Sequence, residues 1–195
     1  IPAGFNSIGA STITSAGNTA MDIRGSSHTI LDSYVQGTSA VAVTGSTGTV
    51  IGGSVLAAVT AGSNALTLTG GSVNLTIATS TLRGGSAGAG LALNEGNVGI
   101  VALGSVTFTG SARGLEISTQ GALFSLAADS ITFRALTAGA TGIHFLGGTF
   151  VSTFTLADFE DTSVGANVSA AALDVNSRIT MNAYSGVRKG SVYEN

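Results

Sequence analysis

The chain has 195 residues, of which only 9% are charged, and its formal net charge is −3. About 25% charged residues is typical, and neither a basic surface for nucleic acid nor a polybasic surface for membranes fits this composition. Cysteine is absent, which excludes disulfides, thiolate catalysis and cysteine-based zinc sites. Polar residues interrupt every apolar run before the roughly 18 to 20 residues that a membrane span needs, so we expect no membrane span.

A short phrase, two apolar residues around one variable residue, recurs along the chain and indicates internal repeats. The copies are Met21-Asp22-Ile23, Val41-Ala42-Val43, Leu66-Thr67-Leu68, Leu91-Ala92-Leu93, Leu115-Glu116-Ile117, Ile143-His144-Phe145 and Leu173-Asp174-Val175. Their first residues are separated by 20, 25, 25, 24, 28 and 30 positions, and Ala or Gly precedes most copies. Such a period is typical of a solenoid, whose repeats bury their apolar faces by stacking on their neighbours.

Two further apolar clusters follow the phrase in each repeat. The second cluster passes through Ile30, Ile51, Ile77, Leu103, Leu126, Phe150 and Ile179, and the third through Val35, Val55, Leu82, Phe108, Phe133, Phe159 and Val187. Alternation with period two, rich in Val, Ile, Thr and Phe, predicts strands, and Gly, Ser and Asn clusters predict corners. We therefore predict an all-β fold, a single-stranded parallel β-helix (β-solenoid) of about seven coils with three short strands each.

The domain organisation that this pattern predicts is one β-solenoid domain over residues 1–195, because no linker interrupts the repeats. Residues 1–19 are expected to form an incomplete first coil, and residues 160–195 an irregular closing coil or cap with more charged and aromatic residues. Residue 1 is not Met and no signal peptide follows it, so we expect a processing site or the edge of a fragment there.

Sequence motifs for nucleotide, zinc, hydrolase and calcium chemistry are absent, so no cofactor and no metal are predicted. The glycine-rich run from Gly84 to Gly90 has neither the lysine nor the strand-to-helix context of a phosphate loop, which favours a solenoid corner. His28 lies in a polar turn, and no second histidine or acid stands at ligand spacing from it.

One candidate catalytic constellation follows from the predicted register. The variable residues of three successive phrases are Glu116, His144 and Asp174, and stacked rungs would place them in one outward column. Twice the interstrand spacing puts the two carboxylates roughly 9 to 10 Å apart, near the separation of an inverting glycosidase pair. The alternative, which we favour, is a solvated polar ladder, because outward strand positions are where polar residues belong.

A second acidic group lies near the third strands of the same coils. It consists of Asp129, Asp158, Glu160 and Asp161. If the loops brought it beside the first column, a carboxylate-lined groove for a sugar or a cation would result. Solvated turns are the alternative interpretation, with Arg113 and Arg134 available to neutralise these acids, and surface pairs of this kind contribute only about 0 to 1 kcal/mol.

The coils around Met21-Asp22-Ile23 and Ile143-His144-Phe145 resemble the right-handed parallel β-helix of the pectate-lyase-like superfamily, especially bacteriophage tail spikes and tail fibres. The resemblance is architectural and covers nearly the whole chain. It implies a homotrimeric, elongated virion appendage that binds the host surface, where carbohydrate is a candidate ligand. The chain departs from the pectate lyases in lacking their cluster of calcium-binding aspartates and catalytic arginine. It also contains no Trp to stack on a sugar ring.

Three functions therefore remain open. The first, which we favour, is a structural host-attachment component of a virion appendage, in contact with other virion or cell-surface proteins. The second is a polysaccharide-degrading enzyme, a glycoside hydrolase or polysaccharide lyase, and the third is an exported bacterial β-helical adhesin at the cell surface. The segment from Ser33 to Leu82 contains no charged residue, and its predicted outward residues, including Ala42 and Thr67, are small and uncharged. Because contact with another copy would cover such a surface, we expect self-association through this segment.

Overall fold

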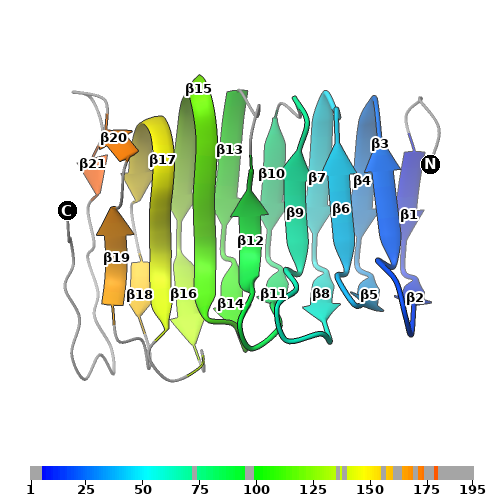
Figure 1. Cartoon of the computed structure of the whole chain (residues 1–195). Helices are drawn as coiled ribbons and strands as arrows, with labels where there is room; N and C mark the ends of the chain where they lie inside the picture. The colour runs from blue at the N-terminus through cyan, green and yellow to red at the C-terminus, as the bar shows by residue number, and fades with distance from the viewer. Residues whose placement is uncertain are drawn as a thin grey trace.

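The computed structural model of the chain shows a parallel β-solenoid with no helix among the described residues (Figure 1). It describes residues 6–71, 74–94, 99–134, 137, 140–154, 157–159, 164–168, 171–173 and 178–179. Each coil passes through three strands, and each strand pairs in parallel with the equivalent strands of the coils before and after it. This arrangement confirms the predicted fold class.

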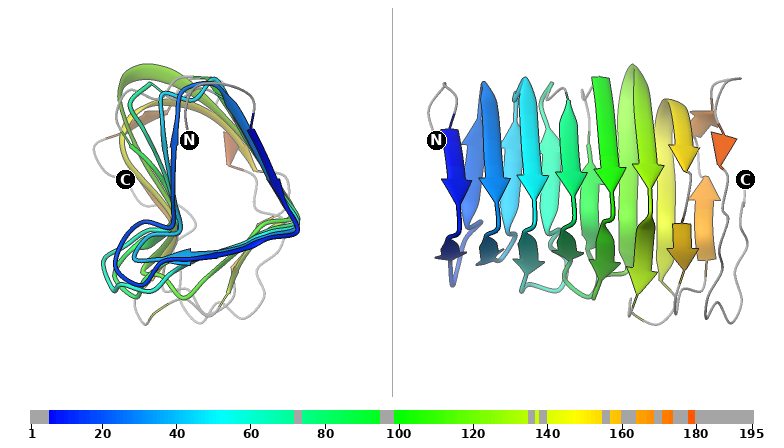
Figure 2. Two further views of the ribbon diagram at one scale, coloured as in Figure 1. Left: turned by 90° about the vertical axis from the view of Figure 1, so that its right-hand side faces the viewer. Right: turned by 180° about the vertical axis from the view of Figure 1, so that it is seen from behind.

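The strands form three stacks, which are the sides of one cross-section when the solenoid is viewed along its axis (Figure 2). The first stack contains β3 (Met21–Arg24), β6 (Val41–Thr44), β9 (Leu66–Thr69), β12 (Ala89–Leu93), the first parts of β15 (Arg113–Asp129) and β17 (Thr141–Phe154), and β19 (Val164–Val168). The second contains β1 (Asn6–Gly9), β4 (Ser27–Leu31), β7 (Gly48–Gly52), β10 (Leu75–Ala78), β13 (Gly99–Gly104), the last parts of β15 and β17, and β21 (Arg178–Ile179). The third contains β2 (Thr12–Thr14), β5 (Tyr34–Gly37), β8 (Val55–Ala58), β11 (Thr81–Arg83), β14 (Thr107–Thr109), β16 (Ile131–Arg134) and β18 (Ala157–Phe159).

The solenoid makes about five complete turns from β1 to the first part of β15, fewer than the seven that the sequence predicts. The later strands continue the same stacks, but β15 and β17 are each one continuous strand that passes from the first stack into the second, with register shifts between Ile117 and Leu123. In the predicted incomplete first coil, β1 and β2 pair with β4 and β5. In the predicted closing coil, β20 (Ala171–Leu173) and β21 pair with β17.

The inward column of the first stack is confirmed where the side chains are described. Leu68, Leu93 and Ile117 are buried and lie in register on successive strands. Phe145 pairs with Ile117 on the backbone, and Val175, the last predicted member, lies outside the described residues. Each coil therefore buries its apolar side chains against the neighbouring coils, as a solenoid requires.

The inward column of the third stack differs from the prediction at one position. Leu56, not Val55, is the buried residue of β8, and it pairs with Val35 and Leu82. Val55 points outward and is exposed. The two residues are adjacent and both apolar, so strict alternation allows either register, and a one-residue shift exchanges the faces. Val187, predicted for the same column, lies outside the described residues.

Glycines of the first stack make room for phenylalanines of the third. Phe108 and Phe133 are fully buried and stacked, with ring centroids 5.0 Å apart. A Cβ on Gly90 would come within 2.7 Å of Phe108 Cδ1, and one on Gly114 would overlap the Phe133 ring. The coils therefore combine large rings with residues that have no side chain, and this keeps the interior filled without strain.

A ladder of serines fastens the corner between the second and third stacks. The backbone N–H of Ser33 donates to Ser54 Oγ at 3.1 Å, and that of Ser54 donates to Ser80 Oγ at 3.2 Å. Ser54 Oγ in turn donates to the carbonyl of Gly52 at 2.8 Å. The preceding residue at each corner, for example Asp32 with φ of 48°, adopts the left-handed conformation that turns the chain. These bonds satisfy backbone groups that the corner removes from the strand ladders.

Candidate functional site

The outward column of the first stack brings two of the three candidate residues together. Glu116 on β15 and His144 on β17 are register partners, as the sequence predicts. The next partner of His144 is Asn167 on β19, which is a correction, because Asp174 was expected there. Leu173, from the phrase that contained Asp174, belongs to β20 and pairs with Phe150 instead. Asp174 itself lies outside the described residues.

The register explains why the sequence pattern failed at this coil. Thr141 pairs with Val164, so this coil advances by 23 positions rather than the 30 that the spacing of the phrases gave. The phrase that continues the column is Ala166-Asn167-Val168, which is less apolar than Leu173-Asp174-Val175. Hydrophobicity alone therefore favoured the wrong copy.

An arginine that the sequence analysis assigned only a general neutralising role is the close partner of Glu116. Arg113 Nε lies 2.5 Å from Glu116 Oε2, an ion pair whose angle is poor for a hydrogen bond. Arg113 also donates from its terminal nitrogen to the carbonyl of Ala87 at 3.2 Å, in the corner that precedes β12. This contact holds the Arg113 guanidinium in place. Its positive charge then compensates the negative charge of Glu116, which lies on the same strand.

His144 is close to this pair but does not complete a hydrogen bond with it. His144 Nδ1 is 3.8 Å from Glu116 Oε2 and has no hydrogen-bond partner among the described residues. Partial burial lowers the pKa of His144 below its ordinary value of 6.5, while the Glu116 carboxylate raises it and the Arg113 guanidinium lowers it further. Burial is the largest of the three effects, so the ring is neutral at pH 7.

The chemistry available to this cluster is limited by its acids. An inverting glycosidase needs two carboxylates on either side of the bond to be cleaved. Among the residues whose side chains are described, the column carries two carboxylates, Asp22 and Glu116, which are four rungs apart, roughly 19 Å. Each is paired with an arginine of its own strand, Asp22 with Arg24 and Glu116 with Arg113. The neighbouring rung carries Ala92, which is fully buried and offers no functional group.

The second acidic group is divided between stacks. Asp129 ends β15 in the second stack, whereas Asp158 lies on β18 in the third stack, where it pairs with Thr132. Glu160 and Asp161 lie outside the described residues. Asp129 and Asp158 therefore do not line a groove beside Glu116, which belongs to the first stack.

His28 is the second residue of β4 and is buried, rather than lying in an open turn. Its Nε2 donates to the carbonyl of Gly25 at 3.0 Å, and its Nδ1 has no partner among the described residues. No group of three or more His, Asp or Glu side chains within the described ranges is placed to hold a metal ion.

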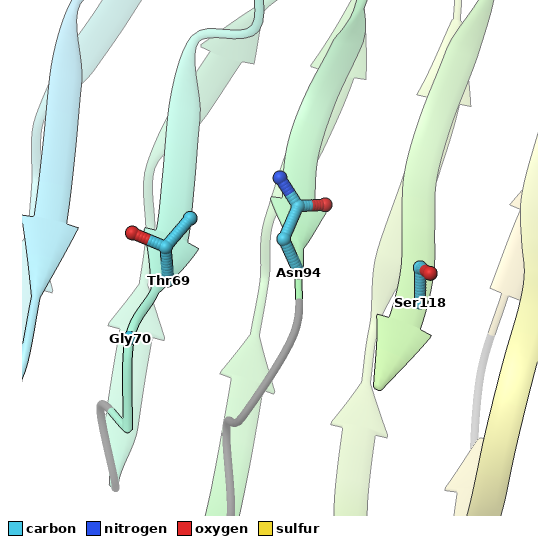
Figure 3. Close-up of a pocket in the computed structure, with 4 residues that line it drawn as sticks. All are labelled: Thr69, Gly70, Asn94 and Ser118. Atoms are coloured by element: carbon cyan, nitrogen blue, oxygen red, sulfur yellow. The ribbon is translucent and has the colours of Figure 1, made fainter. Parts of the chain in front are cut away.

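A hollow of about 430 Å³ lies at the end of the first-stack strands, two residues beyond the Glu116 position (Figure 3). Thr69, Asn94 and Ser118 line it from neighbouring strands, together with Gly70. Thr69 Oγ1 also lies 3.2 Å from Thr44 Oγ1, so hydroxyl groups follow one another along this edge. The described residues of the lining offer hydrogen-bonding groups and include no carboxylate. The sequence analysis did not identify this hollow, because it depends on how the corners bend away from the strands.

No protein family, no curated protein and no solved structure matches the chain. In the described part of the chain, no helix has the length and apolar character to cross a membrane.

Proposed function

We propose that the chain is a structural, host-attachment component of a bacteriophage virion appendage of the tail-spike or tail-fibre type, assembled as a homotrimer. The observation that carries this proposal is the exposure of large apolar side chains, such as Val50 and Ile100, on charge-poor outer faces of a regular solenoid. Large apolar side chains exposed on charge-poor faces are typical of surfaces that contact other proteins. The resemblance of the coils to tail-spike solenoids supports the virion as the location.

Immunogold electron microscopy of the phage particles tests this proposal. Antibody raised against the chain should label an appendage of the particle. Label confined to the bacterial surface would refute the proposal and favour an exported adhesin. Label on the capsid interior would refute both of these functions.

The enzymatic alternative has its own test in the Glu116 column. Glu116→Gln and Asp174→Asn should leave attachment to host cells unchanged, because the proposal gives neither carboxylate a chemical role. Depolymerisation of host-surface glycan by the native chain, lost in either variant, would contradict this expectation and establish an enzyme.

A further inference from the structure

A hollow of about 360 Å³ lies where the outer face of the third stack meets the loops that lead to the first stack. Its floor is Ala57, which points outward from β8 and is nevertheless only 4% exposed. The register partners of Ala57 on the neighbouring strands are Gln36 and Arg83, whose longer side chains rise on either side of it. The volume lies at the lower end of the roughly 300 to 1,000 Å³ that is typical of small-molecule sites.

Two loops form a wall of this hollow, at a corner where the loops project beyond the strands (Figure 2). The first loop follows β8 and contributes Val59 and Ala61, and the second follows β11 and contributes Gly85 and Ser86. The loops are joined to each other, because the backbone N–H of Ala87 donates to the carbonyl of Ala61 at 2.6 Å. The wall is therefore in place before a ligand binds.

Arg83 brings a positive charge to one end of the hollow. Its side chain is exposed, and no described residue forms an ion pair or a hydrogen bond with its guanidinium. The aliphatic stem lies against Gly110, where an added Cβ would come within 3.1 Å of Arg83 Cγ. The sequence places no acid in the segment from Ser33 to Leu82, which forms the coils on one side of Arg83. The charge is therefore available to a ligand in the hollow.

Gln36 supplies hydrogen-bond donors at the other end. The Tyr34 hydroxyl donates to Gln36 Oε1, and the amide nitrogen of Gln36 has no hydrogen-bond partner in the described part of the chain. Two rungs separate Gln36 from Arg83, which is roughly 9 to 10 Å between their backbones. Ser86 adds a hydroxyl group between loop and solvent. The described side chains of the lining thus offer donors at both ends and include no carboxylate, which favours a ligand rich in acceptors.

We propose that this hollow binds a sugar acid, with the carboxylate on Arg83 and hydroxyl groups of the sugar at Gln36 and Ser86. A planar guanidinium presents two parallel N–H donors that match the two oxygens of a carboxylate. The inference rests on the proposed function, because a host-attachment component requires a ligand on the host surface. It adds the place on the solenoid where that ligand binds and the charge that the ligand carries.

The charge of the hollow selects this class of ligand. Arg83 offers one positive charge, whereas a phosphate monoester carries about −1.5 to −2 at pH 7. An acidic peptide would present several carboxylates, and the next arginine of the column, Arg134, lies two rungs beyond Arg83 and outside the lining. A sugar acid carries one carboxylate per ring among neutral hydroxyl groups, and its C–H groups have apolar partners in Val59 and Ala61.

A titration of the full chain followed by NMR tests the ligand class. Glucuronate is the probe, and glucuronamide is the matched ligand with the same ring but no charge. The native chain should bind glucuronate at least about tenfold more tightly, because hydrogen bonds to an ionised group are roughly twice as strong as neutral ones. Equal affinities would overturn the proposal. So would equally tight binding of butyrate, which has a carboxylate but no hydroxyl group, or tighter binding of a tetraglutamate peptide.

Substitutions separate the roles of the two ends. Arg83→Met keeps the stem against Gly110 and removes the charge, so this variant should bind glucuronate no more tightly than glucuronamide. Gln36→Met should weaken the binding of both ligands by a similar factor and keep the preference between them. Arg24→Gln changes an exposed arginine on the first stack and should leave both dissociation constants unchanged. A preference that persists in Arg83→Met, or that is lost in Arg24→Gln, would overturn the assignment.

The inference and the proposed function fail in different ways. A chain that labels the appendage but does not distinguish glucuronate from glucuronamide refutes this inference alone. A chain that prefers glucuronate through Arg83 but is absent from the appendage refutes the proposed function alone.

Discussion

Replacing Gly114 by alanine should destabilise the solenoid far more than the size of one methyl group suggests. The new Cβ would overlap the ring of Phe133 and approach the carbonyl oxygen of Gly142 to 2.7 Å. The ring has little freedom to move, because it is fully buried and stacked on Phe108 at 5.0 Å. Overpacking of this kind costs about 1 to 3 kcal/mol, and we expect Gly114→Ala to lie at the upper end of that range.

A second substitution at Phe133, the ring that the new Cβ would overlap, tests whether packing is the cause. Two coils earlier, the corresponding positions hold the fully buried pair Leu82 and Ala65, which shows that leucine and alanine fit together there. Phe133→Leu alone should cost about 1 to 2 kcal/mol by leaving a cavity. In the double variant the leucine frees the space that the new methyl group needs, so the two losses should not add. A coupling energy of about 1 kcal/mol or more is expected for residues in contact.

Urea unfolding followed by circular dichroism measures these changes in the free energy of unfolding. Gly104→Ala is the matched control, because no atom lies within 4 Å of a Cβ built there. It should change the free energy of unfolding by less than about 0.5 kcal/mol. A Gly114→Ala chain as stable as the control, or strictly additive losses in the double variant, would refute the packing argument.

Three further predictions concern the core, the serine ladder and the histidine. Leu93→Asp should prevent folding or truncate the solenoid, because an unpaired carboxylate would replace a fully buried side chain, and a thermal unfolding curve like that of the native chain would contradict this. Ser54→Ala leaves the Ser33 N–H without its partner, although the Gly52 carbonyl still accepts from the Asp32 N–H, and should cost about 1 to 3 kcal/mol in urea unfolding, whereas the exposed Ser86→Ala should cost little. Because the folded pKa of His144 is lowered, the unfolded chain binds its proton first, so stability should fall as the pH drops below 6.5 towards the lower folded value. His144→Gln should flatten this part of the midpoint-against-pH curve, and an unchanged curve would show that His144 does not contribute.

The stacking of the coils could be predicted from the sequence because each first-stack phrase allows only one assignment of its inward-facing residues. Leu91-Ala92-Leu93 places two large apolar residues on one face of a strand, and the spacing to Leu66-Thr67-Leu68 then fixes which rungs are neighbours. The same logic failed at Ser54-Val55-Leu56, where two apolar residues are adjacent. The structure resolves that case through Ser54, which is buried in the serine ladder and so shifts the inward position to Leu56.

The candidate site was predicted in part for the same reason. Glu116 and His144 occupy the central positions of well-formed phrases, so their adjacency followed from the register. The pairing of Arg113 with Glu116 did not follow, because residues three apart on a regular strand point to opposite sides. The Asp174 prediction depended on a coil length that apolar spacing does not determine once the phrases become less regular.

Electron cryomicroscopy of the assembled chain tests most directly the central claim that this solenoid is an assembling structural element. The account predicts rods in which parallel solenoids are related by rotation about a shared axis. Isolated solenoids, or copies packed antiparallel, would contradict it.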